Sequence, residues 1–247
     1  TKELDDALLR GEIDFAVHSM KDLPSELPSE LKLVCVPEPE DPRDVFVSRE
    51  GELFDNLPQN AIVGTSSIRR QTIIKHLRPD LKVVEWRGNI ETRLRKLENN
   101  KSISGIILAH AGLSRLQLNS KISHAFDPDI FVPATGQGML AIVCKKEDIV
   151  VQTILARINN LKAFHFAKLQ REFLSLMEGG CTVPVGCFLR ERQDGTLAMI
   201  GYLANSQKEI KCKVNGTMDQ SSDFPLKLFD AMISRGAKTI LADFKKD

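Results

Sequence analysis

Short apolar runs alternate with amphipathic segments along the first part of the chain. Residues 2–10 have the spacing of a helix that ends at Gly11, and Ile13–His18 is an apolar run of strand length. A second such run, Asp44–Ser48, follows a proline-rich stretch that interrupts regular structure. Alternation of helix and strand is typical of α/β architecture with parallel strands.

Three similar units of one strand and one helix follow. Each matches a βα step of a doubly wound sheet. A segment with two prolines at 38–43 and a segment with Pro and Gly at 131–138 indicate two crossings between lobes, and Leu140–Cys144 predicts a strand after the second crossing. Two crossings between two α/β lobes would form a hinged cleft. The strands and helices of the three units are predicted at 61–63 and 67–77, 82–85 and 90–98, and 105–109 and 112–117.

The pattern changes after about residue 160. One long amphipathic helix, 162–177, precedes three strand-like runs and a final helix at 224–235. Asp194-Gly195 separates the first two runs, and this dipeptide favours a tight hairpin. The order of elements predicts a separate α+β domain with a three-stranded antiparallel sheet.

Composition narrows the possible functions. Among 247 residues, 34 Lys and Arg balance 33 Asp and Glu, so the net charge of +1 gives no global field that attracts nucleic acid or a membrane. One Trp and one Tyr offer few stacking platforms for single-stranded nucleic acid. The five cysteines lack zinc-ligand spacing, which predicts no metal site and favours a reducing compartment. No apolar run approaches the ~18 residues that span a bilayer.

Polar side chains follow the first strand of the three units. The segment Gly64–Ser67 lies where a strand gives way to a helix, and a helix N-terminus binds carboxylate or phosphate through its free N–H groups. Arg69 and Arg70 occupy the first helical turn, which is unfavourable for cations unless an anionic ligand is present. The alternative is that Ser67 only caps the helix and that both arginines are solvated.

Arginine recurs after the other two strands. Arg87 and Gly88 directly follow the second strand, Arg93 lies one turn later, and Arg115 follows the third strand. All of them lie at the carboxyl edge of the sheet, where open α/β sheets bind ligands. Because a planar guanidinium matches a carboxylate with two hydrogen bonds, the repetition predicts a carboxylate-binding site.

In the other lobe, Lys21 and Asp22 follow the strand that ends near His18. An Asp beside a Lys remains ionised and could stabilise a positive charge that develops on a reacting atom. On this segment alone, a surface turn is the more common explanation. His18 follows an apolar strand, where a hydrogen-bonded structural histidine is more common than a catalyst.

Cys181 lies in a Glu-Gly-Gly-Cys-Thr-Val-Pro segment just after the long helix. The glycines let the backbone turn and leave the sulfur accessible, as a nucleophile or a covalent attachment site requires. The other cysteines lie in strand-like runs and are expected to be buried. The string Gly136–Ala141 fits the dinucleotide fingerprint, but no strand precedes it, so we interpret it as a hinge turn.

Taken together, these segments resemble porphobilinogen deaminases, also called hydroxymethylbilane synthases. The matching strings occur in the family's order and spacing and cover most of the chain to about residue 190. The combination is highly specific, although no single string would be. The strings are Ala16–Pro24, Asp41–Asp44, Val63–Gln71, Arg87–Arg93, Leu108–Leu116, Pro133–Gly138 and Glu178–Gly186.

The resemblance implies two hinged lobes like those of type II periplasmic binding proteins, plus a third domain that carries a cofactor cysteine. Lobe one would comprise residues 1–38 and 139–157, lobe two 43–131, and the third domain 158–247. Two departures stand out. The family's N-terminal segment is missing before Thr1, which suggests an incomplete chain, and Val143 stands where the family pattern has glutamate.

The implied activity is that of a transferase in tetrapyrrole (haem) biosynthesis that deaminates four porphobilinogen molecules and joins them into linear hydroxymethylbilane. The implied cofactor is a dipyrromethane, thioether-linked to Cys181, and Asp22 matches the catalytic aspartate, which offsets positive charge on the pyrroles. A cytoplasmic monomer without nucleic-acid or membrane partners is expected, with organelle targeting left open by the missing N-terminus. The positions that match contacts to cofactor or substrate are Lys21, Asp22, Thr65, Ser66, Ser67, Arg69, Arg70, Arg87, Gly88, Arg93 and Arg115.

Two other functions fit parts of the pattern. A hinged receptor for a small dicarboxylate would need arginine at both sheet edges, but neither an accessible Cys181 nor a third domain. A thiol enzyme would use Cys181 as a nucleophile with a histidine, but no histidine occupies a diagnostic position. The mass of the intact protein distinguishes the three functions, because only the deaminase carries a stable adduct of pyrrole units.

Overall fold

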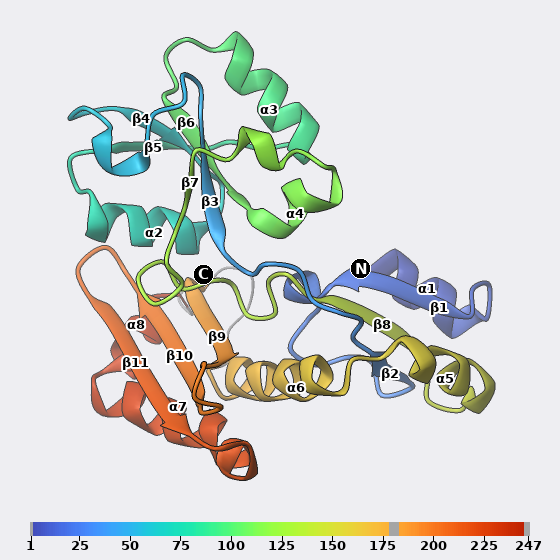
Figure 1. Ribbon diagram of the computed structural model, residues 1–247. Helices are drawn as coiled ribbons and strands as arrows, with labels where there is room; N and C mark the ends of the chain where they lie inside the picture. Colours follow the sequence, from blue (N-terminus) through green and yellow to red (C-terminus); the bar gives the residue numbers. More distant parts are fainter. Residues whose placement is uncertain (1, 178–182, 245–247) are drawn as a thin grey trace.

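The computed structural model describes residues 2–177 and 183–244 of the chain. Three sheets organise these residues (Figure 1). Two of the sheets belong to α/β lobes and the third to an α+β region, which confirms the predicted fold class. In these two ranges, no helix is both long and apolar enough to cross a membrane.

The sheet of lobe one has the order β1-β8-β2. The sequence pattern predicts parallel strands, but β8 runs antiparallel to both neighbours. The path of the chain explains the difference, because β2 leads out toward lobe two and β8 begins where the chain returns. Two helices, α1 and α5, pack against this sheet. The elements are α1 (Lys2–Arg10), β1 (Phe15–Ser19), β2 (Leu31–Cys35), β8 (Leu140–Lys145) and α5 (Ile149–Leu155).

Val143 lies in the middle of β8 and has no exposed surface. It pairs with Ala16 of β1 on one side and with Leu33 of β2 on the other. A carboxylate among these apolar neighbours would lose its hydration without gaining a partner. The apolar surroundings therefore explain why valine fits where the family pattern has glutamate.

The sheet of lobe two has the order β5-β4-β6-β3-β7. Its first three strands are parallel, so their carboxyl ends share one edge, and a helix begins near that edge after each of them. The remaining strands, β3 and β7, are antiparallel to their neighbours. The elements are β3 (Asp44–Ser48), β4 (Ile62–Gly64), α2 (Ile68–Leu77), β5 (Lys82–Val84), α3 (Ile90–Asn99), β6 (Gly105–Ala109), α4 (His110–Arg115) and β7 (His124–Ala125).

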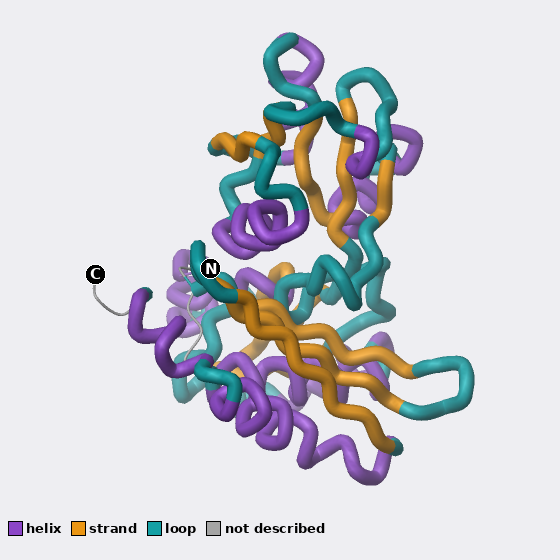
Figure 2. The backbone as a smooth tube through the Cα atoms, turned by 90° about the vertical axis from the view of Figure 1, so that its left-hand side faces the viewer, coloured by secondary structure: helices purple, strands orange, loops and turns teal. Residues whose placement is uncertain are grey.

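The third sheet is antiparallel, with the order β11-β10-β9, and helices cover one of its faces (Figure 2). Its first hairpin turns at Asp194-Gly195, as predicted: Gly195 has φ +78° and the Asp194 carboxylate accepts a hydrogen bond from the Thr196 N–H at 2.9 Å. The elements are α6 (Leu161–Leu176), β9 (Val185–Glu191), β10 (Leu197–Ala204), β11 (Glu209–Gly216), α7 (Phe224–Ser234) and α8 (Ala237–Asp243).

The third region packs against both lobes. One apolar core contains Leu8 of lobe one together with Phe173 of α6. Another contains Ile73 of lobe two together with Ile200 and Tyr202 of β10. Burial of this apolar surface stabilises a definite position of the third region against each lobe.

The two crossings between the lobes lie against each other. The Glu40 N–H donates to the Gly138 carbonyl at 3.0 Å, and the Gln137 side chain donates to the Pro42 carbonyl at 2.7 Å. Gly138 has φ +89°, and a Cβ at this position would lie 2.4 Å from the Glu40 carbonyl oxygen. This close approach requires glycine, and it places the predicted hinge turn between the two lobes.

Candidate functional site

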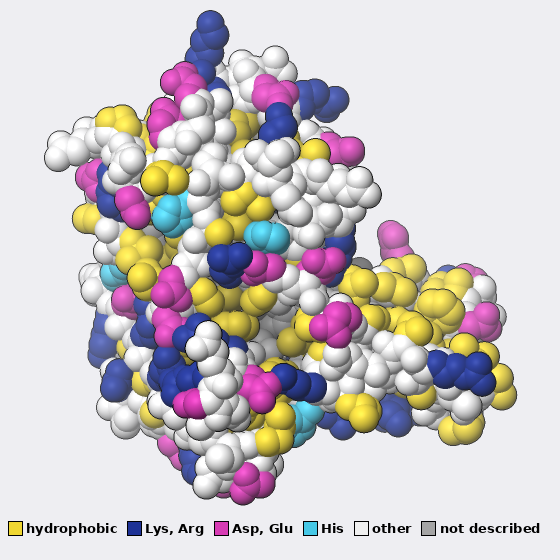
Figure 3. Space-filling model, viewed as in Figure 1, with side chains coloured by type: hydrophobic (Ala, Val, Ile, Leu, Met, Phe, Trp, Pro, Cys, Tyr) yellow, Lys and Arg dark blue, Asp and Glu magenta, His cyan; other side chains and the backbone are white. Residues whose placement is uncertain are grey.

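A cavity of about 770 Å³ lies where the two lobes, the second crossing and the third region meet. The face of the molecule that Figure 3 shows carries Lys and Arg interspersed with Asp and Glu, in keeping with the net charge of +1. The cavity wall is different, since it gathers basic side chains from both lobes. Its principal polar residues are Lys21, Asp22, Ser66, Ser67, Arg69, Arg70, Arg93, Arg115, Thr135 and Gln137.

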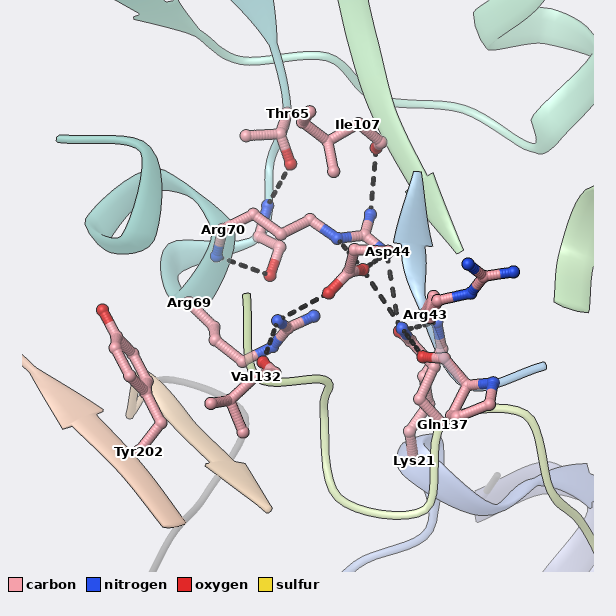
Figure 4. Close-up of polar contacts among 12 residues, drawn as sticks. Lys21, Arg43, Asp44, Thr65, Arg69, Arg70, Ile107, Val132, Gln137 and Tyr202 are labelled. Atoms are coloured by element: carbon pink, nitrogen blue, oxygen red, sulfur yellow. Dashed lines mark hydrogen bonds and ion pairs between the residues drawn. The ribbon is translucent and has the colours of Figure 1, made fainter. Parts of the chain in front are cut away.

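Asp44, the first residue of β3, holds the two arginines of α2 (Figure 4). Its carboxylate accepts from Arg69 at 2.8 Å and from Nε of Arg70 at 2.9 Å, and it has no exposed surface. Burial alone would raise the pKa of Asp44, but the two guanidiniums lower it to about 2. Both arginines are 5% exposed, so the solvated alternative for them is wrong, whereas Ser67 does cap α2.

Gln137 of the second crossing connects this buried cluster to lobe one (Figure 4). Its amide nitrogen donates to Asp44 at 3.1 Å, and its amide oxygen accepts from Arg70 at 3.5 Å and from Lys21 at 3.3 Å. Each nitrogen of the Arg70 guanidinium has a protein acceptor, since NH1 also donates to the Ile107 carbonyl at 3.0 Å. Arg70 is therefore a fixed part of the wall.

Lys21 and Asp22 lie in a single 3-10 turn, Met20–Asp22, directly after β1. The Met20 N–H donates to the Met139 carbonyl at 3.0 Å, which ties the turn to the second crossing. Burial, assisted by the charge of Arg70, lowers the pKa of Lys21 to about 8, although Asp44 and Asp22 act in the opposite direction. Asp22 itself is exposed toward the cavity.

The N-termini of α2 and α3 reach the cavity from lobe two. Ser66 and Ser67 precede α2, and the hydroxyl of Ser66 accepts from the Trp86 N–H at 2.9 Å. Asn89 caps α3 by accepting from the Thr92 N–H at 2.8 Å. Two helix N-termini therefore direct partial positive charge toward the same space.

Two arginines reach the cavity with part of their guanidinium unbound. Arg93 donates through Nε to the Gly88 carbonyl at 2.7 Å, and Arg115 donates to the Gly138 carbonyl at 3.1 Å. In the part of the chain that the structure describes, no acceptor takes up their remaining donors. Gly88 also lines the cavity; its φ of +128° allows the backbone to turn under Arg93.

Three residues singled out from the sequence lie away from the cavity wall. Thr65 is buried, and its hydroxyl accepts from the Ser67 N–H at 3.3 Å. The Arg87 side chain is 73% exposed and pairs with Glu85 at 2.8 Å. His18 is buried with its Nε2 3.9 Å from Asp5, as expected of a structural residue, and burial lowers its pKa.

Cys181 lies outside the described residues. The described residues on either side of it border the cavity: Leu174 of α6 comes before it, and Val183 and Val185 come after it. The other cysteines, at 35, 144, 187 and 212, are free and buried, as expected. Burial raises the pKa of Cys187 in particular, so this thiol is inert.

Sequence reasoning missed Asp44 and Gln137. In the sequence, Asp44 begins the predicted strand Asp44–Ser48 and ends the string Asp41–Asp44, and Gln137 belongs to the hinge turn, but neither pattern gives them a role in the site. A signal existed for Asp44, because an acidic residue that opens an otherwise apolar strand needs a buried partner. No local pattern identifies Gln137, since its contacts come from residues that are distant in the sequence.

The arrangement can hold a ligand with several carboxylates. Lys21, Arg93 and Arg115 offer donors around the cavity, and the Thr135 hydroxyl on the wall has no partner among residues 2–177 and 183–244. Among the described residues of the wall, Asp22 is the carboxylate that faces the same space. A cationic site with one opposed carboxylate can bind an anion and stabilise a positive charge that forms on it.

Comparison with known proteins gives matches along almost the whole chain. The family model described as "Porphobilinogen deaminase, dipyromethane cofactor binding domain" matches residues 1–153, and the one described as "Porphobilinogen deaminase, C-terminal domain" matches residues 164–234. A porphobilinogen deaminase of Pelobacter propionicus is 42% identical over 98% of this chain and 78% of its own length. One from Thermus thermophilus is 39% identical over 99% of this chain and 81% of its own length.

Solved structures give weaker similarities. A lipoprotein of the YaeC family from Enterococcus faecalis is 18% identical, covers 70% of this chain and 81% of its own, and has a TM-score of 0.45. An ABC transporter protein from Parabacteroides distasonis is 17% identical, covers 74% of this chain and 68% of its own, and has a TM-score of 0.40.

Proposed function

Since the chain belongs to the porphobilinogen deaminase family, we propose that the cavity holds the dipyrromethane cofactor and that Asp22 is the catalytic carboxylate. The protein is a transferase of tetrapyrrole biosynthesis that deaminates porphobilinogen and joins four molecules into linear hydroxymethylbilane. One observation carries the proposal: a single cavity brings Asp22 of lobe one together with the basic side chains of lobe two.

The residues present fit the cofactor. A dipyrromethane carries acetate and propionate groups, and the cavity offers the donors of Lys21, Arg93 and Arg115 together with two helix N-termini. Cys181 is the proposed attachment point, because Leu174 and Val183 on either side of it border the cavity. When bound, the cofactor supplies the pyrrole carbon to which the first substrate unit is joined.

Asp22 is proposed to act by charge. Loss of ammonia from the aminomethyl group of porphobilinogen leaves a positive charge that spreads over the pyrrole nitrogen. A carboxylate that is already in place stabilises this charge in the transition state without reorganisation. Asp22 faces the cavity from a turn that the Met20–Met139 hydrogen bond anchors, so its position is set before substrate enters.

The basic residues are proposed to orient the carboxylates. Ser66, Ser67, Arg93 and Arg115, with Lys21, would bind them directly and bring the reacting carbons together. Arg69 and Arg70 would contribute mainly positive charge from within the wall, because Asp44 holds them.

The residues at the margin of the cavity have supporting roles in the proposal. Thr65 shapes the turn that carries Ser67, and Gly88 allows the backbone to turn under Arg93. The pair between Arg87 and Glu85 is exposed and therefore weak, so Arg87 can leave it when an anion enters.

We also propose that the protein is a monomer that acts in the cytoplasm. Three parts of one chain line the cavity, so a second copy is not needed to form it. The described cysteines are free thiols, as a reducing compartment allows.

Replacing Arg93 by methionine tests carboxylate binding. Methionine keeps much of the apolar stem and removes the charged donors. A charge-assisted hydrogen bond contributes about 1.5–3 kcal/mol, so kcat/KM for porphobilinogen should fall roughly 10- to 100-fold. Steady-state kinetics over a range of ionic strength measures this, and the fall in kcat/KM with added salt should become less steep.

The matched control is Arg95→Met on the same helix, since Arg95 is exposed and lies outside the cavity wall. This variant should behave like the unchanged protein. Equal kinetics for the Arg93 and Arg95 variants would contradict the proposed carboxylate site.

A further inference from the structure

Arg171 of α6 contacts the segment that carries Asp22, although nearly 150 residues separate them. Its NH2 group donates to the Pro24 carbonyl at 2.9 Å and to the Ser25 carbonyl at 2.9 Å. Pro24 and Ser25 line the cavity beside Asp22. A group of the third region therefore fixes the chain immediately after the catalytic turn.

The environment of Arg171 is unusual for an arginine. Burial lowers its pKa, although an arginine keeps its charge, and among the described residues no carboxylate lies within ion-pair distance. A partly buried cation without a counter-charge is unfavourable unless its donors are well used. Here one nitrogen, NH2, donates to two adjacent carbonyls, and the planar guanidinium holds this nitrogen at a fixed place between them.

The same face of α6 also borders the cavity. Leu174 lies three residues after Arg171, hence on the same side of the helix, and lines the cavity wall. The helix ends at Leu176, five residues before Cys181. The helix that holds the Asp22 segment thus ends shortly before the proposed attachment point in the sequence.

We propose that Arg171 is a positioning residue for Asp22, which couples the catalytic turn of lobe one to the cofactor-bearing third region. The inference rests on the proposed function. Through this contact, the third region sets where the catalytic carboxylate lies relative to the chain that grows from the cofactor. A displacement of about 1 Å at a catalytic group costs on the order of 10²-fold in rate, so two hydrogen bonds at this position matter.

The test compares Arg171→Ala and Arg171→Lys in the cofactor-loaded enzyme, with Lys168→Ala as the control. Lys168 is an exposed cation on the same helix that lies over the Phe164 ring and does not contact the Asp22 segment. Arg171→Ala should lower kcat roughly 10- to 100-fold with little change in KM and with cofactor still attached. Added methylguanidinium should restore part of this loss, because it can occupy the vacated position.

Lysine at this position supplies the charge, but its ammonium lies one bond nearer the backbone than the NH2 group that contacts Pro24 and Ser25, so Arg171→Lys should remain well below the unchanged enzyme in kcat. Should the alanine variant fail to fold, this lysine variant carries the test alone. Unchanged kcat in either folded variant would overturn the inference, as would a loss that only follows a loss of cofactor. If Asp22→Asn is itself fully active, the proposed function fails; if only the Arg171 variants are fully active, this inference alone fails.

Discussion

Replacing Asp22 by asparagine is expected to lower kcat on the order of 10²–10³-fold while the cofactor stays attached. Asparagine has nearly the same shape but no charge, so it removes the stabilisation of the positive charge on the pyrroles. Asp22 is exposed and makes no ion pair with another described residue, so the free energy of unfolding should change by less than about 0.5 kcal/mol. The rate of porphobilinogen turnover measures the loss of kcat, and the mass of the protein shows whether the cofactor stays attached.

Glu26→Gln is the matched control for this prediction. Glu26 is an exposed carboxylate four residues later that does not line the cavity. Its replacement makes the same change in net charge, so general electrostatic effects appear in both variants. Full activity in Asp22→Asn would remove Asp22 from the mechanism.

Replacing Asp44 by asparagine should have the largest effect on stability. The change leaves Arg69 and Arg70 buried without their counter-charge, and breaking a buried ion pair on one side costs about 3–5 kcal/mol. Activity should fall as well, because the arginines of the cavity wall lose the group that holds them. Urea unfolding at neutral pH measures the first effect and steady-state kinetics the second.

The pH dependence separates this charge effect from simple loss of packing. The pKa of Asp44 lies near 2 in the folded protein, below the 3.8 of an ordinary aspartate. Its contribution is therefore complete above about pH 4 and is lost as the pH falls toward 2. The difference in unfolding free energy between the unchanged protein and Asp44→Asn should shrink over this interval. A difference that stays constant down to pH 2 would contradict the charge explanation.

Asp129→Asn is a suitable control for Asp44. The Asp129 carboxylate also pairs with two basic side chains, Arg190 at 2.8 Å and Lys213 at 2.6 Å. However, about a third of the surface of each of these side chains is exposed, so solvent screens the pair. This variant should lose less than about 1 kcal/mol and keep its activity.

The sequence pattern predicts most of the elements, because local chemistry determines them. Ser67 caps α2, Asp194-Gly195 forms the hairpin, and Gly138 occupies the hinge turn, all as expected. The direction of β8 could not be read from periodicity. It depends on which lobe the chain has just left, and an apolar run looks the same in either direction.

In the candidate site too, local pattern predicts some features, whereas others depend on the folded chain. Recurrence of arginine after successive strands predicts the cationic edge, because parallel strands bring their carboxyl ends together. Arg93 and Arg115 do reach the cavity, whereas Arg87 turns outward to Glu85. The repeated arginines predict which edge of the sheet is cationic, but not the direction in which each side chain points. Asp44 and Gln137 were missed because their partners come from separate elements and meet only in the folded chain. The proposed domain boundaries and the roles of the site residues remain predictions.

The mass of the intact protein tests the central claim most directly. The account predicts that freshly purified active protein carries a stable adduct with the mass of two linked pyrrole units, and that Cys181→Ser lacks both the adduct and the activity. Cys144→Ser, in which a buried free thiol is changed, should keep the adduct. Active protein with an unmodified mass, or an adduct that persists in Cys181→Ser, would contradict a cofactor tethered at Cys181 in the cationic cavity.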